Sequence, residues 1–278
     1  MSSADRPPLR VVYLIGAGHC GSTLLDICLD AHPQITGLGE ITTLTPGNPA
    51  PVELPVWSRA AALHLERTGA AIEAVPYKPA DRGIGGLLSN ARPSARWQEE
   101  NLAALHAIAD ASGTAILADS SKEWQRLQAL SHTPGIELKV IHLVRDARGI
   151  INSYRRKDGT WRRGYRRLMK LDLSALFLRR KRISRADWHR VRYEDLAARP
   201  EETLRAIAGF LDLPFDQVML NPDPTRYSGI GGNRMRNRQF QGFSLDEGWR
   251  RALSRPAALA AHMASLPHNL RHGYRLFR

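Results

Sequence analysis

A glycine-rich turn between an apolar run and a helical pattern places the tightest constraint on the fold. Residues 11–15 are apolar, residues 16–23 read Gly-Ala-Gly-His-Cys-Gly-Ser-Thr, and a helical pattern begins at Leu24. A strand that ends in such a turn and opens a helix cradles an anion, because glycines let backbone N–H groups crowd around it and the helix N-terminus adds a favourable dipole. The sequence therefore predicts a phosphate-binding turn near the N-terminus.

The turn differs from a nucleoside triphosphate loop at one position. Such a loop reads G-x-x-x-x-G-K-[ST]. Gly16 and Gly21 have the required spacing, but Ser22 stands where the lysine belongs. We therefore expect the turn to hold a phosphate or sulfate ester and to serve ATP or GTP hydrolysis poorly.

Length and composition predict one α/β domain over residues 1–278. The chain has 278 residues, 43% of them hydrophobic, which suits a sizeable core. No apolar run reaches the ~18 residues of a transmembrane helix, and residues 1–10 lack the apolar segment of a secretory signal. Cys20 and Cys28 suggest no disulfide framework. Together these features predict a cytoplasmic location.

The net charge of +13 favours anionic partners. Nucleic acid, a phosphorylated cofactor and an acidic membrane would all satisfy it. Aromatic residues make up only 7% of the chain, and no nucleic-acid recognition motif is present. We therefore predict no nucleic-acid partner. The oligomeric state is unknown from the sequence.

Alternating strand and helix patterns predict an α/β fold with a P-loop-like, doubly wound, mainly parallel sheet flanked by helices. The expected strands cover residues 10–17, 115–119, 138–144 and 189–193. The expected helices cover residues 22–31, 98–111, 123–131, 147–156, 163–182, 201–211 and 256–265. Ligands of such sheets bind beyond the carboxyl ends of the strands, where the turns after Ile15, Ala118 and Val144 fall.

Two further regions stand out by composition. Residues 43–93 are rich in proline and glycine and have weak periodicity, which predicts an irregular lid or acceptor-binding region. Residues 155–185 are densely basic with apolar residues between the charges, which predicts an amphipathic helix with a basic face. Such a face is either solvated surface or a site for an anionic membrane or acceptor.

Polar residues at two strand ends are candidates for binding and chemistry. Arg145 follows an apolar strand and Ser153 lies about two turns into the next helix, so the pair could share a phosphate. Alternatively, Arg145 pairs with a carboxylate. Lys122 either stabilises charge on a leaving oxygen or is a solvated lysine. Asp119 is either a magnesium ligand like that of an NTPase or a helix cap.

Three residues near the anion turn have competing interpretations. Glu40 follows Gly37-Leu38-Gly39 and is either a general base or a surface glutamate. His19 lies inside the turn, where an imidazole can be cationic beside an anion, and this favours a functional role. For Cys20, a small filler role is favoured over a nucleophilic one.

Four sequence blocks follow one another along the chain: residues 16–25 with Ala31-His32-Pro33, residues 143–148 with Ser153, residues 191–196 with Pro200 and Phe210-Leu211, and residues 231–236. Together they resemble the sulfotransferases that use 3′-phosphoadenylyl sulfate (PAPS). The resemblance is strongest to the bacterial sulfotransferase-domain branch and more distant to the tyrosylprotein sulfotransferases. Because the order and spacing hold over roughly residues 10 to 250, the match is more specific than any single block.

The resemblance implies how the donor is bound. Arg145 and Ser153 would hold the 3′-phosphate, and Tyr193 would contact the adenine. A late loop would close over the 3′-phosphate side through Gly231, Gly232 and Arg236. The 5′-phosphosulfate would lie on the first turn, formed by Gly18, His19, Cys20, Gly21, Ser22 and Thr23.

The resemblance also implies the catalytic residues. Glu40 lies where the tyrosylprotein branch has its general base, and Lys122 matches a basic residue that the family often has after this strand. Many relatives carry Arg or Lys at the position of His19, and Ser is usual at Cys20. Because a neutral imidazole stabilises a leaving phosphate less, the change at His19 predicts a pH dependence or a larger share for Lys122.

The implied activity is in-line transfer of a sulfuryl group to a hydroxyl, or an amine, on a small-molecule, lipid or glycan acceptor. The reaction needs a carboxylate base for the acceptor and cations for the departing phosphate, and it needs no metal ion. One alternative is a P-loop kinase or NTPase, favoured by Asp119 and opposed by Ser22. Another is a non-catalytic protein that binds anionic polymers or membranes through residues 155–185.

Overall fold

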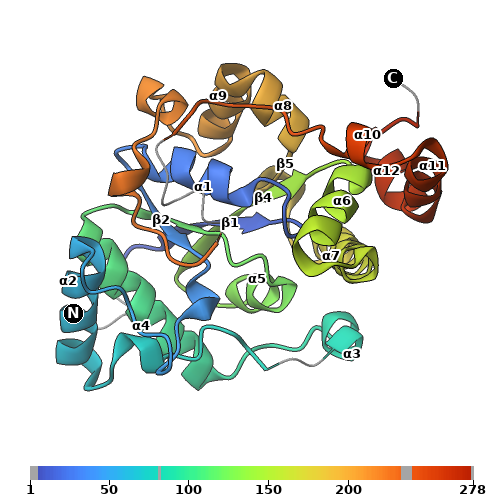
Figure 1. The fold of residues 1–278 in the computed structure, drawn as a ribbon. Coiled ribbons are helices and arrows are strands. Elements are labelled where there is room, and N and C mark those ends of the chain that lie inside the picture. The colour runs from blue at the N-terminus through green and yellow to red at the C-terminus, as the bar shows by residue number, and fades with distance from the viewer. Residues whose placement is uncertain (1–5, 81–82, 233–239, 277–278) are drawn as a thin grey trace.

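A five-stranded parallel sheet forms the centre of the molecule (Figure 1). The structure is a computed structural model and describes residues 6–80, 83–232 and 240–276. The strand order is β2-β3-β1-β4-β5, and every neighbouring pair is parallel. The carboxyl ends of all strands therefore meet at one edge, and the predicted doubly wound α/β fold is confirmed. The strands are β1 (Leu9–Ile15), β2 (Ile35–Gly39), β3 (Ile116–Asp119), β4 (Ile136–Val144) and β5 (Trp188–Arg192).

Strand β2 is the one that the sequence analysis missed. Its five residues include Gly37 and Gly39, which weaken a strand pattern. Gly39 has φ +66°, and a Cβ there would collide with the backbone of Ile230. That backbone pairs with β2, since Glu40 N donates to Ile230 O (2.6 Å) and Ile230 N donates to Leu38 O (3.1 Å). The glycine that hides the strand therefore allows a late segment to approach it.

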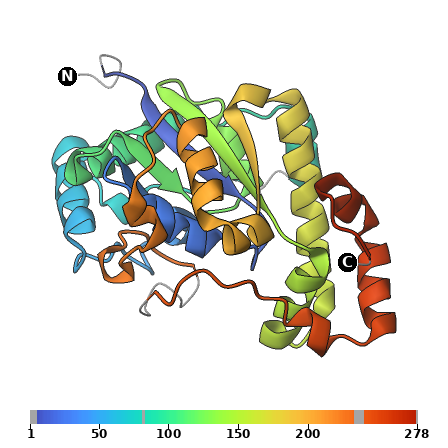
Figure 2. The same cartoon turned by 90° about the horizontal axis from the view of Figure 1, so that it is seen from above.

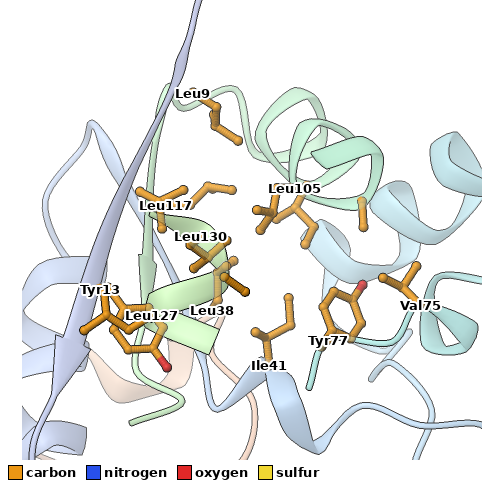
Figure 3. Close-up of a cluster of buried hydrophobic side chains, with 14 of the residues drawn as sticks. Leu9, Tyr13, Leu38, Ile41, Val75, Tyr77, Leu105, Leu117, Leu127 and Leu130 are labelled. Atoms are coloured by element: carbon orange, nitrogen blue, oxygen red, sulfur yellow. The ribbon is translucent and has the colours of Figure 1, made fainter. Parts of the chain in front are cut away.

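Alternate residues of β1 supply two hydrophobic cores, one on each face of the sheet. Val12 and Leu14 pack with α1 (Ser22–Asp30) and α9 (Pro200–Phe210). Val11, Tyr13 and Ile15 pack on the opposite face with residues of α4 (Ala95–Ser112) and α5 (Trp124–Leu130). Figure 3 shows part of this second core, including Tyr13, Leu105 and Leu127.

The remaining helices surround the sheet, and several of them lie beyond its β5 edge. Helices α10 and α11 pack against α6, and Figure 2 shows the C-terminal helices running alongside α7. All seven predicted helices are present with small shifts at their ends. The other helices are α2 (Pro55–Thr68), α3 (Gly83–Leu88), α6 (Ala147–Asp158), α7 (Trp161–Lys181), α8 (Tyr193–Ala198), α10 (Trp249–Ala252), α11 (Arg255–Ala264) and α12 (Leu266–His272).

Helix α2 corrects the expectation of irregular backbone over residues 43–93. Pro55 occupies its first turn, and Gly69 ends it in the left-handed conformation. Its buried residues Trp57, Ala60 and His64 recur at spacings of three and four, which gives one apolar stripe against α4. The surrounding prolines and glycines masked this short pattern in the sequence.

No helix within the described residues is long and apolar enough to span a membrane.

Candidate active site

The turn between β1 and α1 has the backbone of an anion cradle. His19 and Gly21 both have positive φ (66° and 95°). A Cβ at Gly21 would lie 2.7 Å from the ring of Tyr193, so only glycine fits there. Helix α1 begins directly afterwards with no acidic residue in its first turn and no side-chain cap. Its first amides are therefore not neutralised by a side-chain carboxylate at the helix N-terminus.

Cys20 fills space beneath the turn. Its side chain is fully buried, and burial raises the pKa of the thiol. A buried thiol with a raised pKa has little thiolate character. The filler interpretation of Cys20 therefore fits the structure better than the nucleophilic one.

A carboxylate and an ammonium group converge at one end of the turn. Glu40 follows β2 and Lys122 follows β3, and Lys122 Nζ contacts Glu40 Oε1 and, at 3.3 Å, Ser22 Oγ. The Glu40 and Lys122 side chains are 27% and 17% exposed, so the pair is screened only in part by solvent. Two strand ends and the start of α1 thus bring a potential base and a potential cation together.

The glycine pair Gly231-Gly232 lies at this same end. A Cβ at Gly231 would lie 2.9 Å from Glu40 Cβ, and one at Gly232 would lie 3.2 Å from Thr23 Oγ1. The pair therefore borders Glu40 and Thr23, two residues that the sequence analysis assigned to the site. Arg236, the third predicted residue of the late loop, lies outside the described residues.

Arg145 lies at the other end of the turn, on the β4 side. Its guanidinium donates to His19 O (2.8 Å) and Asp246 O (2.7 Å), and it lies 4.3 Å from the centre of the Tyr193 ring. It also forms an ion pair with the Asp246 carboxylate at 3.1 Å. Arg145 therefore lies at the turn, and it also has the carboxylate partner that the alternative interpretation expected.

Ser153 lies on the helix face that receives Arg145. A Cβ at Gly149 would lie 3.0 Å from Arg145 Nε, and Ser153 follows Gly149 by four residues on the same face of α6. The Ser153 side chain is buried, and no hydrogen bond joins its hydroxyl to another described residue. An Arg and a Ser thus face the same space beside the turn.

Tyr193 is fixed between the turn and a C-terminal segment. Its hydroxyl donates to Ser244 O (3.1 Å) and accepts from Asp246 N (3.0 Å).

The ring of His19 meets the ring of Tyr154 edge-on, with centres 4.8 Å apart. The β4 side of the site is therefore densely packed around its polar groups.

Asp246 is a site residue that the sequence analysis missed. It contacts Arg145 and, at 3.5 Å, Arg156. Partial burial opposes ionisation, but hydrogen bonds from Gly248 N and Arg145 outweigh it and hold the pKa of Asp246 below its ordinary value. Residues 240–248 have no helical or strand period, so no sequence signal pointed to this carboxylate.

Asp119 is part of a buried ion pair. It accepts from Arg126 Nε at 2.7 Å and from Ser121 N at 3.0 Å, and both side chains of the pair are 0% exposed. The residue at the start of α5 is Glu123, so Asp119 does not cap that helix. Since both carboxylate oxygens are engaged within the protein, the magnesium-ligand interpretation has no support from this geometry.

Asp26 on α1 forms hydrogen bonds with two other elements of the site. Its Oδ2 accepts from Ser120 Oγ (2.7 Å) at the end of β3 and from Tyr227 Oη (2.5 Å) ahead of the glycine pair. Its Oδ1 is buried without a hydrogen-bond partner among the described residues. Burial raises the pKa of this carboxyl to about 7. The residue on α1 therefore connects the anion turn to the segments that carry Lys122 and Gly231.

The fold and these side chains define a P-loop-like group-transfer protein whose anion turn lacks the lysine of triphosphate enzymes. The chain belongs to the sulfotransferase family, because the model of that family matches residues 12–217. This match covers well over half of the chain and includes the turn, Glu40, Lys122, Arg145 and Tyr193.

Individual relatives agree with the family assignment. Carbohydrate sulfotransferase 1 from Homo sapiens is 35% identical over 133 residues, which cover 41% of this chain and 32% of that protein. Carbohydrate sulfotransferase 1 from Danio rerio is 36% identical over 115 residues, covering 34% of this chain and 27% of that protein. The chain thus spans about a third of the length of the curated relatives that it matches.

Solved sulfotransferase structures share the fold. The sulfotransferase domain of the Synechococcus PCC 7002 olefin synthase has a TM-score of 0.56 and 22% identity, with 95% of each chain covered. Sulfotransferase STF9 from Mycobacterium avium has a TM-score of 0.55 and 17% identity, covering 96% of this chain and 78% of that one. At these identities the likeness shows the fold, and the roles of individual residues need an argument from the site itself.

Proposed function

We propose that this protein transfers a sulfuryl group from PAPS to a hydroxyl group, or less favourably an amine, of a glycan or other small acceptor. The observation that carries the proposal is the convergence of Glu40, Lys122 and Ser22 beside an anion turn that has no P-loop lysine. Family membership and the carbohydrate sulfotransferase relatives support both the reaction class and a carbohydrate acceptor.

Different parts of the site would bind different groups of the donor. Arg145 and Ser153 on the β4 side would hold the 3′-phosphate, by charge-assisted hydrogen bonds from the guanidinium and the hydroxyl. Backbone amides of residues 18–23 would hold the 5′-phosphosulfate, together with the Ser22 and Thr23 hydroxyls. Tyr193 lies beside Gly21 and Arg145, where an adenine that follows the two phosphates would reach its ring.

Sulfuryl transfer would take place at the Glu40 end of the turn. Glu40 would accept the proton of the acceptor hydroxyl as the new S–O bond forms. Lys122, Ser22 and His19 would stabilise the negative charge on the phosphate oxygen from which sulfur departs. Lys122 already contacts both Glu40 and Ser22, so it needs only a small displacement to serve the leaving oxygen. No step of this scheme requires a metal ion.

The acceptor is proposed to enter beside residues 43–93 and the basic helices. Exposed Arg and Lys residues gather on the last turn of α6 and along α7, near the exposed Trp161 (47%). Such a surface suits an anionic acceptor or a peripheral contact with an anionic membrane. We retain a cytoplasmic location as part of the proposal, because both cysteines are free and buried.

Two measurements on the full chain test the proposed function. Isothermal titration should detect adenosine 3′,5′-bisphosphate binding without magnesium, whereas ATP with magnesium should bind more weakly and should not be hydrolysed. Radiolabelled PAPS should then transfer its sulfur to at least one member of a glycan panel. Magnesium-dependent ATP turnover, or the absence of any bisphosphate binding, would contradict the proposal.

A further inference from the structure

A buried cluster of three histidines and one aspartate lies behind Arg145, outside the donor turn. His142 comes from β4, Asp172 from α7, and His268 and His272 from α12, and all four are at most 6% exposed. Asp172 Oδ1 lies 2.9 Å from His272 Nε2 and 3.2 Å from His268 Nδ1. We call these four residues the histidine cluster.

Hydrogen bonds within the described residues leave nitrogen atoms of the histidine cluster without partners. His272 Nδ1 is buried and unpaired. His142 contacts the rings of Trp188 and His272, and no hydrogen bond joins its nitrogens to a described residue. Buried imidazoles without partners are costly unless another group binds those nitrogen atoms.

The histidine cluster also borders a small cavity. His142, Asp172 and His268 line a space of about 10 Å³ together with apolar residues and Arg145. That volume is close to the room that one water molecule or one ion occupies. Ligand atoms of His142, Asp172 and His272 all lie within 4.8 Å of one another.

We propose that the histidine cluster is a divalent transition-metal site, with Zn²⁺ as the preferred ion. Two imidazoles and one carboxylate are a donor set that suits zinc. In a tetrahedral zinc site with bonds of about 2.0–2.1 Å, ligand atoms lie about 3.3–3.4 Å apart. Shifts of somewhat under an ångström in each side chain would therefore bring the three ligand atoms to one ion. His268, or a water molecule, would provide a fourth ligand.

Neighbouring contacts are those expected around a metal site. Arg271 forms an ion pair with Asp172 Oδ2, which leaves Oδ1 directed at the histidines. His268 Nε2 lies 3.0 Å from the carbonyl oxygen of Arg145. Outer contacts of this kind orient metal ligands. A bound ion would therefore fasten α12 to β4 and α7 directly behind Arg145, in a structural role separate from sulfuryl transfer.

A metal-free interpretation makes the opposite prediction. In that case Arg271 and the imidazole N–H groups neutralise Asp172, and the cluster is an ion-pair network that joins α12 to α7. Such a network has no stoichiometric affinity for Zn²⁺. The two interpretations therefore differ in a quantity that is measured without any enzymatic assay.

The test uses the untagged full chain, because a polyhistidine tag would itself bind zinc. The protein is stripped with a chelator, reloaded with Zn²⁺ and dialysed to remove unbound ion. We expect one Zn²⁺ per chain by elemental analysis, and a rise in the unfolding temperature with Zn²⁺ concentration, since an ion that binds only the folded state stabilises it. Co²⁺ should give a visible ligand-field absorption band of nitrogen-coordinated character. Absence of stoichiometric Zn²⁺, or absence of that band, would overturn the proposal.

Two variants locate the ion. His142→Gln and His272→Gln should each weaken Zn²⁺ binding by roughly 10- to 100-fold or more, because each removes a ligand. His106→Gln, which changes a mostly buried histidine of α4, should leave the affinity unchanged. Wild-type affinity in both cluster variants would place the ion elsewhere and reject the site. Should a variant fail to fold, the Co²⁺ spectrum of the wild-type protein decides alone.

Discussion

Two carboxylate–cation pairs meet at the carboxyl end of β3, and they differ in almost every physical respect. Asp119 pairs with Arg126 in the core, where both side chains are 0% exposed. Lys122, three residues later, pairs with Glu40 at the sheet edge, where the side chains are 17% and 27% exposed. Arg126 also donates to Tyr77 O and to Asn101 Oδ1, each at 2.8 Å. Among the described residues, the Lys122 ammonium forms only one other hydrogen bond, to Ser22 Oγ at 3.3 Å.

The difference separates a pair that serves folding from one that is available for chemistry. Breaking a buried pair leaves an uncompensated charge in the core, which is strongly destabilising. A partly exposed pair contributes little to stability, because water replaces the lost partner. The comparison therefore predicts that variants of Asp119 and Arg126 unfold more easily, and that variants of Glu40 and Lys122 lose activity while remaining folded.

Glu40→Gln should have the largest effect on turnover. Loss of the proposed general base should lower kcat by roughly 10²- to 10⁴-fold, while the affinity for adenosine 3′,5′-bisphosphate stays unchanged. Sulfate transfer from radiolabelled PAPS measures the first quantity and isothermal titration the second. Glu123→Gln is the matched control, since Glu123 also pairs with a lysine, but with Lys78 instead of Lys122. A fully active Glu40→Gln enzyme would remove Glu40 from the mechanism.

Arg126→Met tests the buried side of the comparison. It should lower the free energy of unfolding by about 3–5 kcal/mol, because Asp119 then keeps a buried charge without a partner. Urea denaturation followed by tryptophan fluorescence measures this loss. The double variant with Asp119→Asn should recover part of it, as the orphaned charge is removed. Stability equal to that of the wild type would show that burial does not separate the two pairs.

Lys122→Met tests the exposed side. It should lower kcat by roughly 10²- to 10³-fold, the usual cost of one missing donor at a developing negative charge. The free energy of unfolding should change by less than about 1 kcal/mol. Lys78→Met, which removes a 54%-exposed lysine from a comparable ion pair, should do neither. A large loss of stability in Lys122→Met would assign this lysine to the fold.

Arg145→Ala extends the comparison to the other end of the turn. It should weaken adenosine 3′,5′-bisphosphate binding by about 2 kcal/mol or more, roughly 30-fold, because charge-assisted hydrogen bonds to the 3′-phosphate are lost. Titration calorimetry measures the change. Arg156→Ala is the control, since Arg156 also contacts Asp246 but is exposed. Equal affinity in Arg145→Ala and the wild type would reject the 3′-phosphate assignment.

The turn, the strand ends and most helices were predictable because each has a local signal. Apolar runs marked four strands, and the spacing of Gly16 and Gly21 marked the turn. The pairing of Lys122 with Glu40 had no such signal, because it depends on β2 lying beside β3 and on residue 122 adopting φ +62°. Likewise, no local pattern could show that Asp119 is neutralised by Arg126 in the core or that Asp246 reaches Arg145 from 101 residues away.

Asp26→Asn adds a third carboxyl to the comparison, one that is buried and forms no ion pair with another described residue. Its partners are the hydroxyls of Ser120 and Tyr227, and burial raises its pKa to about 7. The folded state therefore retains a proton that the unfolded chain releases above about pH 4. Because the folded-state pKa is raised, the contribution of Asp26 to stability falls as the pH rises from about 4 to 7.

Because asparagine has no titratable carboxyl group, the stability of the Asp26→Asn variant does not fall in this way. The variant should therefore gain stability relative to the wild type by about 1 kcal/mol per pH unit between pH 5 and 7. Urea denaturation of both proteins across this range measures the difference, in which the titrations of other buried groups cancel. The exposed control Asp212→Asn should run parallel to the wild type. If Asp26→Asn also runs parallel, then Asp26 is ionised in the folded protein, and this buried carboxylate on α1 does not need a cation to remain charged.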